Sequence, residues 1–294
     1  MAFILAGAPV AESIRQEAAE IARPLIDRGM PPSLCLIRAN DDPAAVSYER
    51  SLVKAASKLG FDTVPVRLSA SSDDSDIIEA VQDADMDTAI DGIMVLAPLP
   101  KGVDAHLIAD AIYPAKDVDG ASPSSLMGVF TGSHTGFAPA TAEAVVRILD
   151  FYDIPVEGRR VAVLGRSLVV GKPAAMMLLE RNATVTLCHS RTHDLPRILR
   201  DAEIIVSAVG SPGFITSEML SAGDGTDLHE DAFGKVVIDV GVNEGPGGSL
   251  CGDVDSEGVM PYVKAITPVP GGVGAVVTAL LMLHCAIAAE SRRG

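Results

Sequence analysis

Residues 159–192 read RRVAVLGRSLVVGKPAAMMLLERNATVTLCHSRT, and this stretch decides the fold class. Residues 161–164 form a short β-branched apolar run, which is typical of a strand buried on both faces of a sheet. A glycine-containing loop follows, and then a helix that starts at Lys172-Pro173, where proline is tolerated because a first-turn amide has no helical partner. Residues 184–188 supply the next strand. Strand, loop, helix and strand together predict a βαβ unit of a parallel sheet.

The loop of this unit is a candidate phosphate-binding site, because its amides and the helix N-terminus would face a pyrophosphate. The candidate cofactor-binding residues in it are Gly165, Arg166, Ser167 and Gly171. Their spacing, Gly-x-Ser-x-x-x-Gly, departs from the usual dinucleotide fingerprint. The loop alone is therefore equally compatible with an ordinary crossover of a parallel sheet.

The residues that follow the second strand favour NADP over NAD. An acidic side chain at this place would bind the ribose 2′-hydroxyl of NAD. The chain has His189, Ser190 and Arg191 there instead, with Arg166 in the preceding loop. A hydroxyl and a guanidinium suit a 2′-phosphate, and the alternative is a solvated surface arginine. Further cofactor-binding candidates are Gly210 and Val242, which follow later strands, and Thr267, which begins the run 267–274.

Composition excludes several classes of protein. A net charge of −16 argues against nucleic-acid binding, which needs a basic face. Four well-separated cysteines without a Cys-x-x-Cys pair predict reduced thiols in the cytoplasm. The six histidines lack the spacing of metal ligands, so no metal is expected. The N-terminus does not read as a signal peptide, and the apolar stretch 275–289 is shorter than the ~20 residues that span a bilayer, which predicts a buried helix and no membrane partner.

Hydrophobic periodicity along the 294 residues predicts two α/β domains with a cleft between them and a boundary near residue 138. The helices expected from it are 10–26, 43–60, 75–84, 106–111, 139–150, 194–199 and 275–289. The expected strands are 33–38, 61–68, 92–96, 161–164, 184–188, 204–209 and 235–240. The polar segment 223–234 is expected to be an exposed excursion.

Three loops carry candidate substrate-binding residues. Pro98 lies just beyond the strand 92–96, where active-site loops of parallel sheets occur. The turn Asp117-Val118-Asp119-Gly120 offers two carboxylates, one to bind a ligand and one to cap. Residues 267–274 read TPVPGGVG: two prolines stiffen this run and three glycines let backbone amides approach a ligand at a helix start.

Several motifs together resemble the methylenetetrahydrofolate dehydrogenase/cyclohydrolase family along nearly the whole chain. They are Asp41-Asp42-Pro43-Ala44 with Ser47-Tyr48, Pro98-Leu99-Pro100, Lys116-Asp117-Val118-Asp119-Gly120, Gly165-Arg166-Ser167, Val170-Gly171-Lys172-Pro173, Cys188-His189-Ser190-Arg191-Thr192, Val237-Ile238-Asp239-Val240-Gly241, Gly252-Asp253-Val254 and the run 267–274. The resemblance implies a folate-binding domain formed by residues 1–138 and 273–294, a Rossmann-type NADP-binding domain at 139–272, and a homodimer.

The resemblance also implies two reactions on tetrahydrofolate derivatives. Methylenetetrahydrofolate gives a hydride to NADP, and the methenyl product is hydrolysed to 10-formyltetrahydrofolate. Tyr48 and Asp119 are the implied catalytic residues, with Asp119 anchoring the pterin and Tyr48 lining the pocket. The substrate-binding candidates are Tyr48, Leu52, Leu96, Pro98, Asp119, Pro270, Gly271 and Gly272.

The chain departs from the family at two positions that matter for hydrolysis. Leu52 stands where the family has its catalytic lysine, and Leu96 stands where it has a supporting glutamine. Lys54 cannot take the place of that lysine, because two residues turn a helix by about 200°. Loss of a general acid–base group costs roughly 10²–10⁴-fold in rate. We therefore expect dehydrogenase activity with weak or absent cyclohydrolase activity.

Three alternatives remain open from the sequence. The first is a fully bifunctional enzyme with another proton relay, through water and Tyr48. The second is a family-derived oxidoreductase with a different substrate, which further departures at Ala140 and Val276 suggest. The third is a non-catalytic protein that binds NADP or folate.

Overall fold

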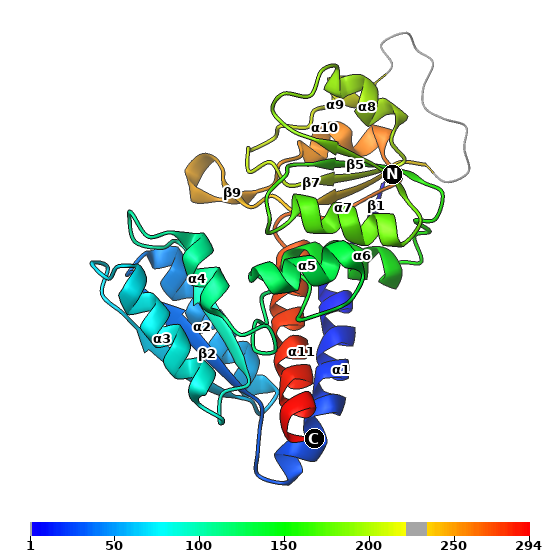
Figure 1. The fold of residues 1–294 in the computed structure, drawn as a ribbon. Coiled ribbons are helices and arrows are strands. Elements are labelled where there is room, and N and C mark those ends of the chain that lie inside the picture. The colour runs from blue at the N-terminus through cyan, green and yellow to red at the C-terminus, as the bar shows by residue number, and fades with distance from the viewer. Residues whose placement is uncertain (1, 222–233) are drawn as a thin grey trace. The chain divides into compact units, whose positions relative to one another are not determined.

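The computed structural model describes residues 2–221 and 234–294. Backbone contacts divide the chain into two compact α/β units (Figure 1). Unit 1 comprises Met1–Ala11 and Thr141–Val277, and unit 2 comprises Glu12–Ala140 and Thr278–Gly294. The expected excursion at 223–234 lies outside the described residues except for Gly234. The predicted fold class is confirmed, whereas the domain roles and the cleft remain predictions.

Unit 1 is built on a six-stranded sheet in which every pairing is parallel. Its order is β1-β11-β8-β7-β5-β6. The strands are β1 (Phe3–Ile4), β5 (Arg160–Leu164), β6 (Thr184–Cys188), β7 (Ile204–Ser207), β8 (Val236–Asp239) and β11 (Ala265–Ile266). The four strands expected between residues 161 and 240 are present, and β1 and β11 are additions of two residues each.

Strand β1 explains why the N-terminal residues group with unit 1, although residues 1–138 were expected to form one domain. Phe3 and Ile4 lie opposite Ala265 and Ile266 in the parallel ladder. The amide of Phe3 donates to the carbonyl of Lys264 at 2.7 Å. Residues far apart in sequence are joined here by backbone hydrogen bonds, which a local pattern does not reveal.

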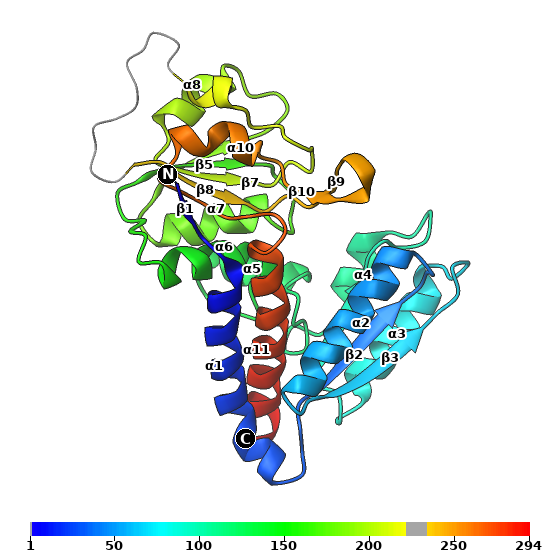
Figure 2. The ribbon, with the colours of Figure 1, turned by 180° about the vertical axis from the view of Figure 1, so that it is seen from behind.

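Helices cover both faces of the unit 1 sheet: α8 and α10 lie on one side, and α6 and α7 on the other (Figures 1 and 2). The elements are α6 (Ala140–Phe151), α7 (Gly171–Glu180), α8 (Leu195–Asp201), α9 (Ser217–Leu220), α10 (Ser256–Val259), the 3₁₀ turns η1 (Pro246–Gly248) and η2 (Met260–Tyr262), and the antiparallel hairpin β9 (Asn243–Glu244) with β10 (Leu250–Cys251). Leu199, Leu220 and Val259 pack into one buried cluster with Ala162 and Ile205 of the sheet. This is the doubly wound arrangement expected for a Rossmann-type unit.

Unit 2 contains a smaller parallel sheet of order β3-β2-β4. Its strands are β2 (Ser33–Arg38), β3 (Asp62–Arg67) and β4 (Gly92–Leu96), and its helices include α2 (Pro43–Lys58), α3 (Asp74–Met86), α4 (Ala105–Ala111) and α5 (Pro123–Thr131). Every residue of the central β2 is buried, whereas β3 is an edge strand that accommodates Pro65. Ile77 and Val81 of α3 and Ile108 of α4 pack on Cys35 and Ile37. Helix α2 covers the opposite face (Figures 1 and 2).

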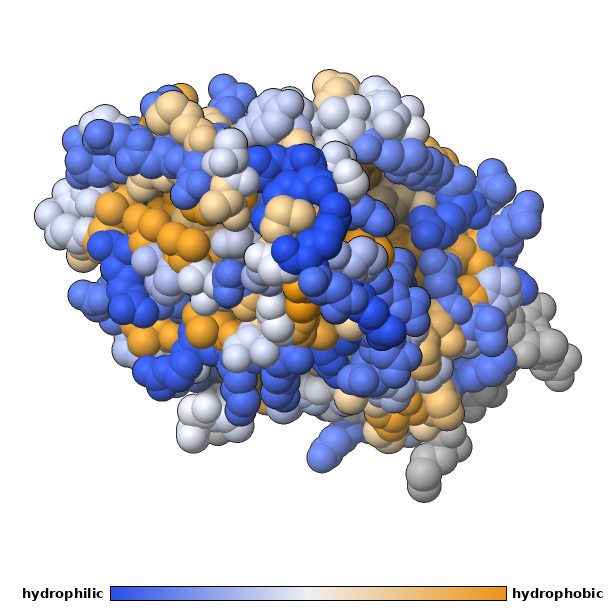
Figure 3. Space-filling view, turned by 90° about the horizontal axis from the view of Figure 1, so that it is seen from below, coloured by the Kyte–Doolittle hydropathy of each residue, from blue (hydrophilic) through white to orange (hydrophobic). Residues whose placement is uncertain are grey.

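Two long helices, α1 (Gly7–Asp27) and α11 (Val273–Arg293), contribute to both units. In unit 2 they lie side by side (Figures 1 and 2). Among the described helices, α11 is the one long and apolar enough to cross a membrane, but 67% of that apolar window is buried within the protein. The burial matches the expected packed helix. Polar and apolar groups alternate on the face shown in Figure 3, as on an ordinary protein surface.

In each unit, a buried lysine from another segment donates hydrogen bonds to the carbonyls at the C-terminus of a helix. Lys116 is almost fully buried, and its Nζ donates to the carbonyls of Ala84, Asp85 and Asp87 at 2.9, 2.7 and 2.8 Å. These carbonyls lie at the C-terminus of α3, where they have no helical amide partner. In unit 1, Lys235 does the same for carbonyls of residues 199, 200 and 202 at the end of α8.

Replacing Lys116 by Met should lower the free energy of unfolding by about 2 kcal/mol, because buried carbonyls lose a charged donor. Chemical denaturation followed by circular dichroism measures this. The exposed Lys101, changed to Met, serves as the control and should shift the value by less than about 0.5 kcal/mol. Equal stability of the two variants would refute the capping role.

Candidate functional site

The predicted nucleotide-binding residues of unit 1 follow the carboxyl ends of five adjacent strands. The ends belong to β11, β8, β7, β5 and β6, in the order of the sheet. The candidates that follow these ends are Thr267, Val242, Gly210, Gly165 and His189. Because all the pairings are parallel, these ends meet at one edge of the sheet, which is where α/β sheets bind ligands. The structure therefore brings the predicted residues of unit 1 to one edge.

The loop between β5 and α7 is close-packed around its two glycines. Gly165 has a φ of 105°, and a Cβ there would collide with the carbonyl oxygen of Ala208. A Cβ on Gly171 would collide with the carbonyl oxygen of Gly165. The hydroxyl of Ser167 accepts from the amide of Val170 at 3.1 Å, so serine stabilises the loop where the usual fingerprint has glycine. Both positions therefore require glycine, and we call this close-packed loop, residues 165–171, the glycine cradle.

The turn after β6 leaves the two predicted phosphate ligands exposed. The amide of His189 donates to Thr192 Oγ1 at 2.9 Å, and the amide of Arg191 donates to His189 Nδ1 at 3.1 Å. These bonds fix the turn, while the side chains of Ser190 and Arg191 are solvent-exposed. An exposed hydroxyl beside an exposed guanidinium fits the 2′-phosphate of NADP.

Asp253 organises the loop after β7, and the sequence reasoning named it only within a motif. This buried carboxylate accepts from the amides of Val209, Gly210 and Ser211 at 2.7, 3.2 and 2.9 Å, and from Asn243 Nδ2 at 2.9 Å. Asp253 therefore shapes the loop after β7, and the amide of Gly210 is used within the protein. The one signal was its place in the motif Gly252-Asp253-Val254.

Thr267 and Val242, two of the cofactor candidates at this edge, differ in the solvent exposure of their side chains. Thr267 is buried, and its Oγ1 accepts from the amide of Asp239 at 2.7 Å, so this hydroxyl bonds inward. The side chain of Val242 is exposed. In the run 267–274, Pro270 and Gly271 are exposed while Gly272 is buried, and Gly271 accepts from the amide of Gly7 at 2.8 Å.

The predicted substrate residues of unit 2 lie on α2 and after β4. Asp42 caps α2, since its side chain accepts from the amides of the first turn at 2.9 and 3.2 Å. Tyr48 is half-buried on this helix and Leu52 is fully buried. Leu96, the last residue of β4, is also buried, and Pro98 is exposed beyond it. The two leucines therefore supply buried apolar surface.

The two carboxylates of the Asp-Val-Asp turn have different tasks. Asp117 is buried and accepts from the amides of Ala121 and Ser122 at 3.0 and 2.7 Å, and from Ser125 Oγ at 2.7 Å. It thereby holds the turn that leads into α5. Burial, together with the nearby charge of Asp117, raises the pKa of Asp119 to about 7.

His284 lies beside this turn, and the sequence analysis counted it only among the six histidines without metal-ligand spacing. It is buried on α11, it stacks on Phe137 with a centroid distance of 4.8 Å, and its Nδ1 donates to the carbonyl of Val118 at 2.7 Å. His284 opposes the upward shift of the Asp119 pKa. Burial and the charge of Asp119 raise the pKa of Tyr48. Asp119 therefore interacts electrostatically with both Tyr48 and His284.

Residues 2–221 and 234–294 contain no group of three or more His, Cys, Asp or Glu side chains placed to hold a metal ion.

Comparison with known proteins covers nearly the whole chain. The catalytic-domain model of the tetrahydrofolate dehydrogenase/cyclohydrolase family matches residues 5–119, and its NAD(P)-binding-domain model matches residues 139–293. The bifunctional protein FolD of Nocardia farcinica (strain IFM 10152) is 44% identical over 290 residues, which cover 99% of this chain and 98% of that protein.

Solved structures agree with this match. The bifunctional FolD methylenetetrahydrofolate dehydrogenase/cyclohydrolase of Campylobacter jejuni superposes with a TM-score of 0.92 at 32% identity, covering 99% of this chain and 100% of that one. The Trypanosoma brucei methylenetetrahydrofolate dehydrogenase-cyclohydrolase, solved with NADP and an inhibitor, gives 0.89 at 32% identity, covering 100% and 99%. The family models, the sequence identity and the shared fold lead to one conclusion: this chain belongs to the tetrahydrofolate dehydrogenase/cyclohydrolase family.

Proposed function

We propose that this protein oxidises 5,10-methylenetetrahydrofolate to 5,10-methenyltetrahydrofolate with NADP as the hydride acceptor. The carrying observation is the glycine cradle of unit 1, which is followed at the same sheet edge by exposed Ser190 and Arg191. When bound, NADP supplies the nicotinamide that takes a hydrogen and its electron pair from the methylene carbon. The substrate becomes a cation that its neighbouring nitrogens stabilise, and no protein group has to move a proton.

Such a reaction depends chiefly on alignment. We propose that the Asp119 carboxylate accepts hydrogen bonds from the pterin and that Tyr48 lines the substrate pocket. Pro98, Pro270, Gly271 and Gly272 are proposed to complete the contacts with the substrate. Support comes from the electrostatic link between Tyr48 and Asp119 and from the exposure of Pro98 and Pro270.

Cyclohydrolase activity is the second candidate function. The names of the relatives describe bifunctional proteins, and this favours full bifunctionality. Asp119, whose pKa is raised to about 7 and which interacts electrostatically with Tyr48 and His284, offers a group for another proton relay. Against it, Leu52 and Leu96 are buried and carry no proton to transfer. The two leucines lead us to expect weak hydrolysis, whereas the names of the relatives favour normal cyclohydrolase activity.

Assembly and location are also proposals. The family resemblance implies a homodimer, which light scattering after size-exclusion chromatography can check. The cytoplasm is proposed as the location because Cys35, Cys188, Cys251 and Cys285 are all free thiols.

Replacing Ser190 and Arg191 together by Ala should raise the KM for NADP by roughly 10- to 100-fold, because charge-assisted bonds to the 2′-phosphate are lost. The KM for NAD, which lacks this phosphate, should change less than about threefold. Initial rates with both nucleotides measure the effect. Arg197→Ala, on the exposed surface of α8, is the matched control. An equal loss for both nucleotides would refute the assignment.

The purified wild-type protein should reduce NADP when it is given methylenetetrahydrofolate, as NADPH absorbance records. Hydrolysis of methenyltetrahydrofolate, measured beside it, should be slow.

The double variant Leu52→Lys/Leu96→Gln should then raise hydrolysis by roughly 100-fold, since it introduces an acid–base group with a polar partner. Wild-type hydrolysis as fast as hydride transfer would establish full bifunctionality instead. Tight folate binding without turnover would indicate a non-catalytic binding protein. The absence of folate binding would indicate an enzyme with a different substrate.

The kcat/KM for methylenetetrahydrofolate should rise with pH and level off above a midpoint near 7, the value of the Asp119 pKa, because the carboxylate accepts bonds from the pterin more strongly than the protonated acid does. Asp119→Asn should abolish this midpoint. His284→Asn retains a donor for the carbonyl of Val118 but removes the influence that opposes the raised pKa, so the midpoint should move to higher pH. A midpoint that stays in place in both variants would contradict the assignment.

A further inference from the structure

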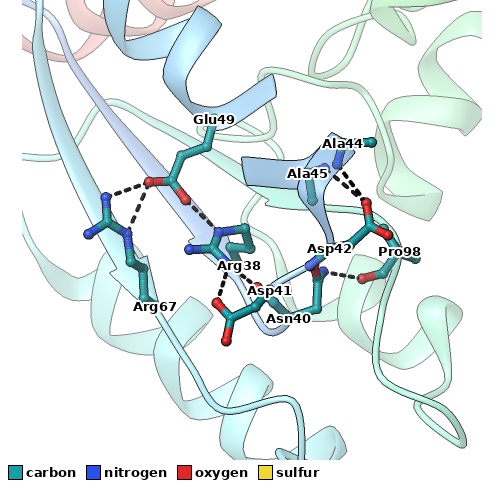
Figure 4. A network of polar contacts seen from close by, with 9 residues as sticks. All are labelled: Arg38, Asn40, Asp41, Asp42, Ala44, Ala45, Glu49, Arg67 and Pro98. Carbon is teal, nitrogen blue, oxygen red and sulfur yellow. Dashed lines mark hydrogen bonds and ion pairs between the residues drawn. The ribbon is translucent and has the colours of Figure 1, made fainter. Parts of the chain in front are cut away.

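A buried guanidinium lies at the carboxyl edge of the unit 2 sheet. Arg38 is the last residue of β2, level with Arg67 on β3 and with Leu96 on β4, and it is only 5% exposed. Its Nε donates to one carboxylate oxygen of Glu49 at 2.6 Å. Arg67 donates to the other oxygen through Nε and Nη2, at 3.0 and 2.7 Å (Figure 4). Glu49, on α2, is 4% exposed and is held from two strands.

The same guanidinium also holds the loop between β2 and α2. Nη1 of Arg38 donates to the backbone carbonyl of Asn40 and, at 2.9 Å, to the carboxylate of Asp41. The side chain of Asn40 then bridges two segments (Figure 4). Its Nδ2 donates to the carbonyl of Pro98 at 2.5 Å, and its Oδ1 accepts from the amide of Asp42 at 2.8 Å.

These bonds form one path from α2 to the Pro98 loop (residues 97–100). Glu49 follows Tyr48 directly, so an ion pair that fixes Glu49 also fixes the turn of α2 that carries Tyr48. A buried charge is tolerated only where its partners are well placed, and Arg38 and Glu49 satisfy each other in this way. The geometry of the loop from Asn40 to Asp42 is therefore determined from within the unit.

The hydrogen bonds of the Asn40 side chain are not needed to satisfy buried polar groups of the core. It is only partly buried, and the groups that it bonds lie where water could reach them. What its amide does is to hold the Pro98 loop against the start of the helix that carries Tyr48. Both segments carry proposed substrate contacts.

We infer that Asn40, held in place by Arg38, is a positioning residue that sets the spacing between the Pro98 loop and the Tyr48 helix and thereby the affinity for the folate substrate. This inference rests on the proposed function. Asn40 acts through Pro98 and α2, and it is not itself placed against the reacting atoms. The Arg38–Glu49–Arg67 cluster holds α2 and the two strands together, and Asn40 links this cluster to the Pro98 loop.

Asn40→Asp tests the inference with the smallest change. The shape and the acceptor for the Asp42 amide remain, while the donor to Pro98 is replaced by an oxygen that faces another oxygen. The KM for methylenetetrahydrofolate should rise on the order of tenfold, and the KM for NADP and the kcat should stay within about twofold. Asp41→Asn is the matched control: its side chain is 93% exposed, and it removes only a surface partner of the same guanidinium, so kinetics should be unchanged.

A second measurement does not depend on turnover. Backbone ¹⁵N relaxation at Ala97 and Leu99 should show lower order parameters in Asn40→Asp than in Asp41→Asn, because the loop has lost its tie. Thermal unfolding of both variants, close to that of the wild type, shows that the fold is retained.

The outcomes separate the inference from the proposed function. An active wild type with an unchanged folate KM in Asn40→Asp overturns the inference, whatever the order parameters show. A wild type that does not oxidise methylenetetrahydrofolate overturns the proposed function. In that case, lower order parameters in Asn40→Asp still support the positional tie, and unchanged ones overturn it.

Discussion

Parallel strand pairing is the constraint on which both units depend. Every ladder in the two main sheets is parallel, so each strand must be reached by a crossover that returns to the starting end. Those crossovers place helices on the faces of each sheet and bury the central strands. They also gather the residues that follow β5, β6 and β7 at one edge, although more than forty positions separate Gly165 from Gly210 in the chain. The grouping of the candidate cofactor residues at that edge is a consequence of the parallel pairing.

Buried charges give the loops at these edges fixed shapes. Asp253 gathers the amides after β7, Asp117 the amides of the turn into α5, and Arg38 the carbonyl of Asn40. A charge removed from water is costly unless it has good partners, so each of these groups stabilises one arrangement of its loop over the alternatives. Glycine and proline make such loops possible, and the buried charges select their conformation.

The two halves of the proposed chemistry make unequal demands on the protein. Hydride transfer needs alignment, which rigid loops at the sheet edges can supply. Hydrolysis needs a group that carries a proton, and buried Leu52 and Leu96 cannot provide one. Asp119, whose pKa burial and the charge of Asp117 raise to about 7, shows that unit 2 still contains one group that can titrate near neutral pH. The proposed hydride transfer can thus rest on geometry, whereas hydrolysis would need residues other than Leu52 and Leu96.

Local pattern determined much of this protein: the βαβ unit at residues 159–192, the long strands and helices, and the preference for NADP follow from short stretches whose periodicity and turn residues act locally. Strands β1 and β11 were missed because two residues show no periodicity, and α5 was not expected either. Asp253, His284 and the Arg38–Glu49–Arg67 cluster were decided only by the tertiary structure. A buried charge is stable only beside its partners, and those partners come from segments far apart in the chain, so no local pattern reveals them.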